Sequence, residues 1–170
     1  MKQIVIDIET TGLNAEGGDR IVEIACIEIN KNRRTTNSFH ARINPERPVE
    51  AGAAQVHGMT WSLLQQEPVF ATIAVELYDF IGGSELIMHN APFRLGFLNA
   101  EFMLLGMPPL TKTCVLTDTL LLARALHPGE ANHLDALCAR YRVDKAELGT
   151  VELLRDVERL ADVYLAMVRR

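Results

Sequence analysis

The first 43 residues carry the apolar and polar patterns expected of β-strands. A short apolar run over 3–8 predicts a buried strand, and alternation over 20–29 predicts a second one. The polar run 31–34 predicts a turn, after which 38–43 returns as a third strand. Together these segments predict an antiparallel meander at the start of the chain.

Helical spacing of apolar residues dominates the remaining sequence. It predicts short helical pieces around Ala51 and Trp61, and longer helices over 69–81, 93–105, 117–126, 134–141 and 151–168. Two short apolar segments, 85–89 and 114–116, lie between helices and predict a fourth and a fifth strand. The order predicts an α/β fold in which helices flank a central mixed five-stranded sheet, in one domain spanning 1–170.

Two carboxylates stand one residue apart where the first predicted strand ends. Side chains alternate along a strand, so Asp7 and Glu9 face the same side. Like charges held this close resist ionising together unless a cation joins them. Oxygen ligands of this kind suit Mg²⁺ or Mn²⁺. This stretch therefore predicts the first motif of a metal-dependent nuclease.

Composition limits the class of protein. Apolar residues make up 48% of the chain, which fits a domain with a substantial core, and the net charge of −5 argues against general coating of nucleic acid. No stretch has the length and apolarity of a membrane span or the pattern of a secretory signal. Cys26, Cys114 and Cys138 match no metal spacing and predict buried free thiols. We therefore expect a cytoplasmic protein with no membrane partner.

Several motifs together resemble the DEDDh 3′→5′ exonucleases, and within them the proofreading subunits of bacterial replicative DNA polymerases. The resemblance runs over nearly the whole chain. The matching segments are 6–12 (IDIETTG), 21–24 (IVEI), 56–58 (VHG), 89–93 (HNAPF), 96–97 (GF), 117–118 (TD), 134–141 (LDALCARY) and 161–167 (ADVYLAM).

This resemblance implies a ribonuclease-H-like exonuclease fold and a site of four acidic residues and one histidine. Asp7, Glu9 and Asp156 match three of the acidic positions, whose implied role is to hold metal ions and carry catalysis. The residues that match substrate-contacting positions are Thr10, Thr11, Gly12, His57 and Phe93. For His57, a structural role beneath a loop is the alternative to a role in the substrate cleft.

Two catalytic positions depart from the family pattern. The family has an aspartate directly after His-Asn-x-x-Phe, where this chain has Arg94. The family histidine lies five residues before the last aspartate, where this chain has Val151, and the tyrosine of a variant subgroup would fall on Glu152. Guanidinium stays charged in proteins, and at ~4 Å and an effective dielectric near 20 each unit-charge interaction is on the order of 4 kcal/mol. We expect Asp7, Glu9 and Asp156 to hold at most one ion.

Arg94 has two possible placements. Its guanidinium could reach the carboxylates and pair with two of them, as a built-in counter-ion, or its long side chain could swing to solvent. Val151 cannot accept a proton, and loss of a general base typically costs about 10² to 10⁴ in rate. His133 is the candidate to replace that base, although its position matches a helix cap. Asp118 and Asp135 also fit helix N-termini, where they would cap.

Three functions remain open from the sequence. The first is an exonuclease fold with an impaired or inactive site, kept for binding nucleic acid or a protein partner. The second is an active Mg²⁺- or Mn²⁺-dependent 3′→5′ exonuclease that releases nucleotides from DNA 3′ ends. The third is a purely structural subunit. A nucleic-acid partner would be a 3′ end, and we favour single-stranded DNA over RNA. The cofactor would be Mg²⁺ or Mn²⁺ if the protein is active, and none otherwise.

The end of the chain carries a further expectation. The sequence stops at Val168-Arg-Arg170, soon after the last predicted helix. In the family's proofreading subunits a flexible tail follows and holds the polymerase. We therefore expect no polymerase-binding tail.

Overall fold

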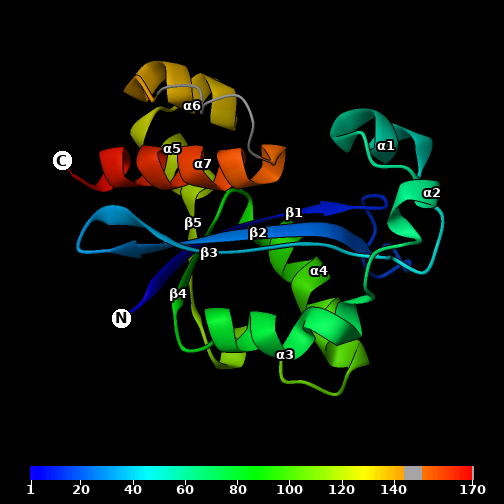
Figure 1. The fold of residues 1–170 in the computed structure, drawn as a ribbon. Coiled ribbons are helices and arrows are strands. Elements are labelled where there is room, and N and C mark those ends of the chain that lie inside the picture. The colour runs from blue at the N-terminus through cyan, green and yellow to red at the C-terminus, as the bar shows by residue number, and fades with distance from the viewer. Residues whose placement is uncertain (144–150, 170) are drawn as a thin grey trace.

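A five-stranded sheet forms the centre of the computed structural model, which describes residues 1–143 and 151–169. The strand order is β3-β2-β1-β4-β5, so β1 is the middle strand (Figure 1). The prediction of a mixed five-stranded sheet in an α/β fold is confirmed. The strands are β1 (Gln3–Thr10), β2 (Ile21–Asn30), β3 (Arg33–Arg42), β4 (Glu85–Met88) and β5 (Val115–Asp118).

Strand directions divide the sheet into two halves. β1, β2 and β3 pair antiparallel, as the predicted meander requires, whereas β1 pairs parallel with β4 and β4 pairs parallel with β5. Parallel neighbours need crossover connections, and the helices α3 and α4 make them here. The carboxyl ends of β1, β4 and β5 consequently lie at the same edge of the sheet. In α/β proteins, ligand-binding sites commonly form at this edge.

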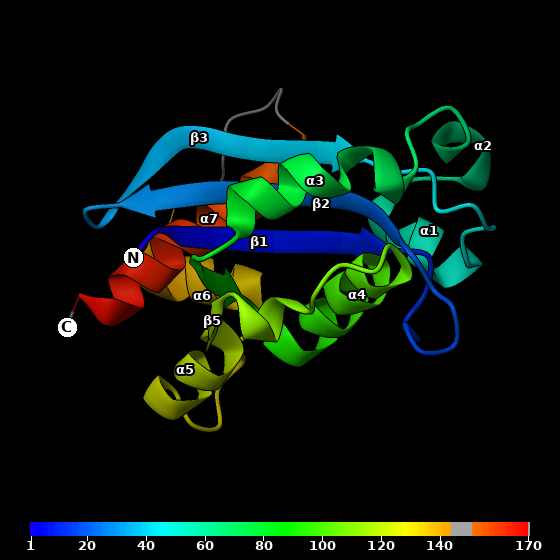
Figure 2. The same cartoon turned by 90° about the horizontal axis from the view of Figure 1, so that it is seen from below.

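Helices cover both faces of this sheet. Figures 1 and 2 show α3 and α4 on one face and α5, α6 and α7 on the other, with α1 and α2 beyond one end. The helices are α1 (Ala51–His57), α2 (Trp61–Leu64), α3 (Phe70–Ile81), α4 (Ala91–Leu104), the 3₁₀ turn η1 (Leu110–Lys112), α5 (Thr119–Leu126), α6 (Leu134–Tyr141) and α7 (Glu152–Val168).

Alternation along β1 creates a separate core on each face. Ile4, Ile6 and Ile8 point to the side of α3 and α4. Val5 points to the opposite side, where the apolar stripe of α7 packs. Asp7 and Glu9 continue the Val5 row, so the chain replaces apolar with acidic residues on the α7 face as β1 approaches its end.

The third strand begins earlier than its sequence predicts. It starts at Arg33 instead of residue 38, and the turn shrinks to Lys31 and Asn32, whose φ angles are +49° and +58°. These left-handed angles suit a tight hairpin. β3 is an edge strand whose first residues are polar and mostly exposed, so no apolar pattern marks them.

Two helix starts and one cysteine also differ from expectation. Thr117 and Asp118 finish β5, and α5 begins at Thr119 rather than 117. α4 begins at Ala91, two residues before the predicted start, with Pro92 in its first turn. Cys26 and Cys138 are buried free thiols as predicted, whereas Cys114 is only half-buried.

Two expectations concern the whole chain: the absence of a membrane span and the single domain. Across the described ranges, no helix combines the length and the apolar character that crossing a bilayer requires. The predicted single domain covers 1–170, so the part of that prediction at 144–150 and at residue 170 lies outside the described residues.

Candidate functional site

The site begins with the carboxylates at the end of the central strand. Asp7 and Glu9 lie on one face of β1, and both are half-buried. Glu9 stands opposite the buried Glu23 of β2 in the strand pairing. Three carboxylates therefore converge on the α7 face, and charge must be balanced there if they are to ionise together.

The loop after β1 is held by its own side chains. The hydroxyl of Thr10 donates to the Gly12 carbonyl at 2.6 Å, and the hydroxyl of Thr11 donates to Asp19 at 2.8 Å. A Cβ placed on Gly12 would come within 2.4 Å of an Asp19 oxygen and 2.7 Å of the Glu50 carboxyl carbon. The sequence assigned Thr10, Thr11 and Gly12 to substrate contact. In the structure the two threonine hydroxyls also hold this loop, and Gly12 leaves room for Asp19 and Glu50.

His57 joins the helix α1 to the same loop. Its Nδ1 accepts the backbone N–H of Met59 at 3.1 Å, so its Nε2 carries the proton and donates to the Thr10 carbonyl at 3.0 Å. Both ring nitrogens are engaged by the protein. This geometry favours the structural alternative for His57 and leaves its edge without a free polar atom.

Arg94 turns inward to the first motif. It lies in the first turn of α4, beyond the end of β4, the parallel neighbour of β1. Its Nε lies 2.5 Å from Asp7 Oδ1, an ion pair whose side chains are only 18% and 13% exposed. Arg94 thus does not swing to solvent. Among the described residues it pairs with one carboxylate, through one nitrogen, and not with two as the inward alternative supposed.

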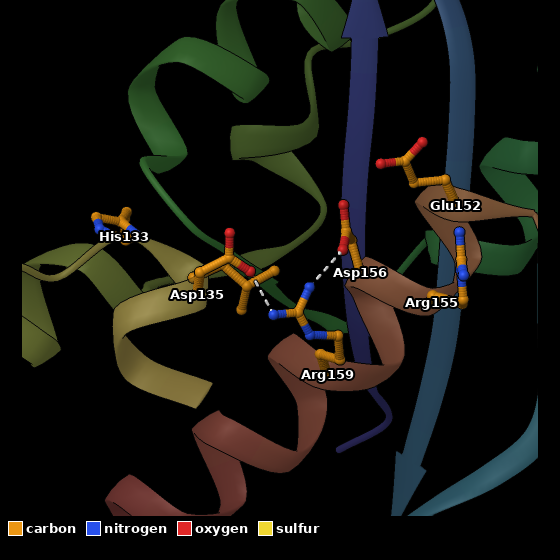
Figure 3. A pocket seen from close by; sticks show the side chains of 7 residues that line it. His133, Asp135, Glu152, Arg155, Asp156 and Arg159 are labelled. Atoms are coloured by element: carbon orange, nitrogen blue, oxygen red, sulfur yellow. Dashed lines mark hydrogen bonds and ion pairs between the residues drawn. The ribbon is translucent and has the colours of Figure 1, made fainter. Parts of the chain in front are cut away.

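A second arginine holds the carboxylate of Asp156. Figure 3 shows Arg159 reaching between α6 and α7, with its Nη1 3.1 Å from Asp156 and its Nη2 2.5 Å from Asp135. Its side chain is 15% exposed, and its buried Nε has no hydrogen-bond partner among residues 1–143 and 151–169. These residues line a hollow of about 410 Å³ with His133, Glu152 and Arg155. The sequence did not single out this arginine; its only signal was the three-residue spacing from Asp156, which is common on solvated helix faces.

The carboxylates as placed do not fit a pair of divalent ions. Asp7 and Asp156 each carry an arginine partner, and Arg94 occupies the position where the family has a further acidic ligand. Within residues 1–143 and 151–169, no group of three or more His, Cys, Asp or Glu side chains is arranged to hold a metal. A guanidinium beside a carboxylate repels a cation that approaches it.

Of the carboxylates at this site, Glu9 alone makes no ion pair with a residue that the structure describes. Burial and the neighbouring charges of Asp7 and Glu23 raise the pKa of Glu9 to about 7, although Arg94 opposes the shift. Burial also raises the pKa of Asp156, against the opposing charge of Arg159. The two arginines therefore balance part of the acidic charge, and the raised pKa of Glu9 favours its neutral, protonated form below about pH 7.

This shift predicts a pH-dependent stability. The folded pKa of about 7 lies above the ordinary value of 4.5, so the folded state binds more protons between these values and stability falls as pH rises from about 4.5 to 7. Replacing Glu9 by Gln should raise the unfolding free energy above pH 7 by about 1–3 kcal/mol relative to wild type. Urea unfolding from pH 4 to 8 measures it. If the unfolding free energies of the two proteins changed in parallel with pH, the raised pKa of Glu9 would be contradicted.

The two positions considered for a general base have different surroundings: His133 lines the hollow of Asp156 and Arg159, whereas Val151 lines another one. Val151 precedes α7 and lines a surface hollow with His40 and Arg42 of β3. His133 caps α6, because its Nδ1 accepts the Ala136 N–H at 3.2 Å. The match of His133 to a helix cap is confirmed, and this contact ties its ring to the helix start.

The capping predictions divide. Asp118 caps α5 as predicted, accepting from Leu120 and Leu121, and it also accepts the N–H groups of Asn90 and Ala91 at 3.1 Å each. Asp135 lies in the first turn of α6, an N-terminal position as predicted, but the N-cap itself is His133, and the Asp135 carboxylate meets Arg159.

Phe93 stands next to Arg94 at the start of α4. Its ring lies 5.1 Å from that of Phe97, at a tilt of 56°, and it is half-buried against the α4 core. Phe93 as a whole is therefore only partly buried. Stacking on a base would need an accessible ring, and this placement is compatible with the predicted substrate role.

A buried ion pair that the sequence did not reveal secures the loop from the α4 side. Arg20 donates two hydrogen bonds of 2.8 Å to Glu101, which is 2% exposed. Glu101 also accepts the Ile21 N–H at 3.1 Å, and the Thr11 N–H donates to the Arg20 carbonyl at 2.8 Å. Bidentate pairs of this type are directional, so α4 and the β1–β2 loop are held in one orientation.

Comparisons with known proteins agree on one family. The family model described as Exonuclease matches residues 4–148. DNA polymerase III subunit epsilon of Pasteurella multocida is 45% identical over 171 residues, which cover 98% of this chain and 68% of that protein. The Escherichia coli protein of the same name is 44% identical over 172 residues, covering 98% and 71%.

Solved structures give the corresponding likeness in fold. Exonuclease X in complex with 5′ overhanging duplex DNA superposes with a TM-score of 0.78 at 23% identity, covering 97% of this chain and 90% of that one. A product-bound exonuclease I gives 0.75 at 15% identity, covering 93% and 42%.

Proposed function

Since the chain belongs to the exonuclease family and has the predicted ribonuclease-H-like exonuclease fold, we propose that this epsilon-like domain binds a DNA 3′ end without hydrolysing it efficiently. The proposal separates two abilities that the family combines. Recognition of a strand end depends on the loop after β1 and the start of α4, which this chain keeps. Hydrolysis depends on the acidic and basic groups that it has replaced.

The contact between Arg94 and Asp7 carries the proposal. At 2.5 Å and largely shielded from water, this guanidinium neutralises the carboxylate that the family uses for metal binding. An ion seeking Asp7 would have to displace Arg94 or approach a permanent positive charge. Tight binding of two ions is therefore unfavourable, and two-metal hydrolysis needs both.

The residue at the general-base position supports the same conclusion. Val151 has no atom that can accept a proton, and His133, the candidate replacement, is committed to capping α6. Impaired metal binding and loss of the base affect one catalytic unit, so their costs in rate need not multiply. Either loss alone would slow hydrolysis strongly.

Support for nucleic-acid binding comes from the family and from residues at the site. The relatives are polymerase subunits, and one structural neighbour, exonuclease X, is in complex with 5′ overhanging duplex DNA. Phe93 is only partly buried beside Arg94, whose charge can attract a phosphate. We propose single-stranded DNA, in preference to RNA, as the ligand.

A single-stranded oligonucleotide labelled at its 5′ end, with a free 3′ hydroxyl, tests the proposal directly. We expect fluorescence anisotropy to show binding that weakens steeply with salt, and gels to show no shortening over hours with Mn²⁺ or Mg²⁺. An RNA strand of the same sequence tests the DNA preference. Mn²⁺-dependent shortening that Asp7→Ala abolishes would replace the proposal with an active exonuclease. Absence of both binding and shortening would leave a structural subunit.

A further inference from the structure

A second hollow adjoins the site on the side of Arg94. It has a volume of about 770 Å³, within the range of small-molecule sites. Its walls come from the end of β4, the first turn of α4, one face of α5 and the segment before α6. The lining residues with polar or charged side chains include His89, Asn90, Arg94, Arg124, Glu130 and His133.

Two arginines, Arg94 and Arg124, line this hollow, and Glu130 is its single acidic lining residue within the described chain. Arg94 already pairs with Asp7, and Glu130 pairs with Arg140 at 2.8 Å, so the charge that makes the hollow cationic comes from Arg124. The carboxylate of Asp118 lies nearby and is already occupied by four backbone N–H groups. The chain as a whole carries −5, so a cationic hollow is a local feature and not a reflection of composition.

Hydrogen-bond donors remain available along the same wall. Arg94 uses its Nε for Asp7, and its two terminal nitrogens make no hydrogen bond with any described residue. Arg124 makes no ion pair within 1–143 and 151–169 and is exposed on α5. His133 accepts a backbone N–H at Nδ1, which leaves the proton of the neutral ring on Nε2 as a donor.

We propose that this hollow binds the phosphate group of a nucleotide, free or within a strand, between Arg94, Arg124 and His133. The inference rests on the proposed function and extends it by naming a phosphate site that needs no metal ion. Guanidinium groups bind phosphate through charge-assisted hydrogen bonds, often in pairs. Arg94 would then face Asp7 with one nitrogen and the phosphate with the others, so the residue that excludes a metal also provides a phosphate contact.

Thymidine 5′-monophosphate, inorganic phosphate and a single-stranded oligonucleotide serve as probes, titrated calorimetrically in EDTA at low salt. We expect binding of the nucleotide to persist in EDTA, because the site uses arginines instead of ions. Arg124→Gln should weaken nucleotide binding at least about 10-fold, as loss of a charged hydrogen bond predicts. His133→Asn keeps a capping oxygen but loses the Nε2 donor, and should weaken binding about 3-fold.

The matched control is Arg33→Gln, which removes an exposed arginine on the distant hairpin and should change affinity less than about 2-fold. Equal affinity of wild type and Arg124→Gln for the nucleotide would overturn the phosphate site, even if oligonucleotide binding stands. Arg124-dependent nucleotide binding in a protein that binds no oligonucleotide would support the phosphate site and contradict the proposed function. Weaker binding of inorganic phosphate than of the nucleotide would assign the rest of the hollow to sugar or base.

Discussion

Replacing Arg94 by Asp and Val151 by His in one chain is expected to give Mn²⁺-dependent shortening of a DNA 3′ end at least about 10²-fold faster than wild type. The first change removes the cation at Asp7 and restores an acidic group at the start of α4. The second supplies a group that can accept a proton just before α7. Timed gels with a labelled single strand measure the rate.

The single variants separate the two contributions. Arg94→Asp alone should gain a Mn²⁺-dependent rise in melting temperature, since a ligand present at 100 times its Kd stabilises by about 2.7 kcal/mol. Val151→His alone should gain neither metal dependence nor activity. Adding Asp7→Ala to the double variant must abolish any hydrolysis. A double variant as inactive as wild type, with metal binding restored, would place the defect elsewhere in the site.

Local pattern was sufficient for most of the fold. Apolar periodicity located α3, α6 and α7 to within a residue at each end, because each helix buries a regular apolar stripe, α3 and α7 against the sheet and α6 against α7. It missed the first half of β3, whose exposed polar residues are held by pairing with β2 and carry no apolar alternation. Edge strands are specified by their neighbours, which a single sequence window does not contain.

At the site, too, contacts that follow from local strand geometry were predictable, and contacts that depend on helix packing were not. Strand alternation placed Asp7 and Glu9 on one face, whereas the sequence left Arg94 either beside them or in solvent; the parallel β1–β4 pair, which brings the start of α4 next to β1, decides for the first. The sequence did not place Arg159 between Asp135 and Asp156, because that contact joins two helices whose relative position depends on packing. Charge compensation of this kind is a tertiary property, and the sequence shows only that the participating charges exist.

The two arginines give the acidic cluster a common explanation. A nuclease of this family must keep several carboxylates close together, and in water-poor surroundings that arrangement costs free energy unless cations are present. Here Arg94 contacts Asp7, Arg159 is shared between Asp135 and Asp156, and the raised pKa of Glu9 favours its protonated form. We propose that these three features let the folded state keep the acids together without a divalent ion.

Removing the inner arginine should make that cost measurable. Arg94→Met keeps much of the side-chain volume but leaves Asp7 without its partner, and we expect the unfolding free energy at pH 8 to fall by about 1–3 kcal/mol. The estimate is below that for a fully buried pair because both side chains retain some exposure, 18% and 13%. Urea unfolding provides the measurement.

A double-mutant cycle connects this loss to the charge on Asp7. Asp7→Asn in the Arg94→Met background should recover most of the stability, because the neutral amide removes the uncompensated charge. The matched control Arg33→Met, on the exposed hairpin, should stay within about 0.5 kcal/mol of wild type. At pH 5 the deficit of Arg94→Met should shrink, since the pH is then below the raised pKa of Glu9, about 7, and a protonated Glu9 no longer repels Asp7. A variant as stable as wild type at pH 8 would mean that the carboxylates tolerate one another without Arg94, and the counter-ion account would be wrong.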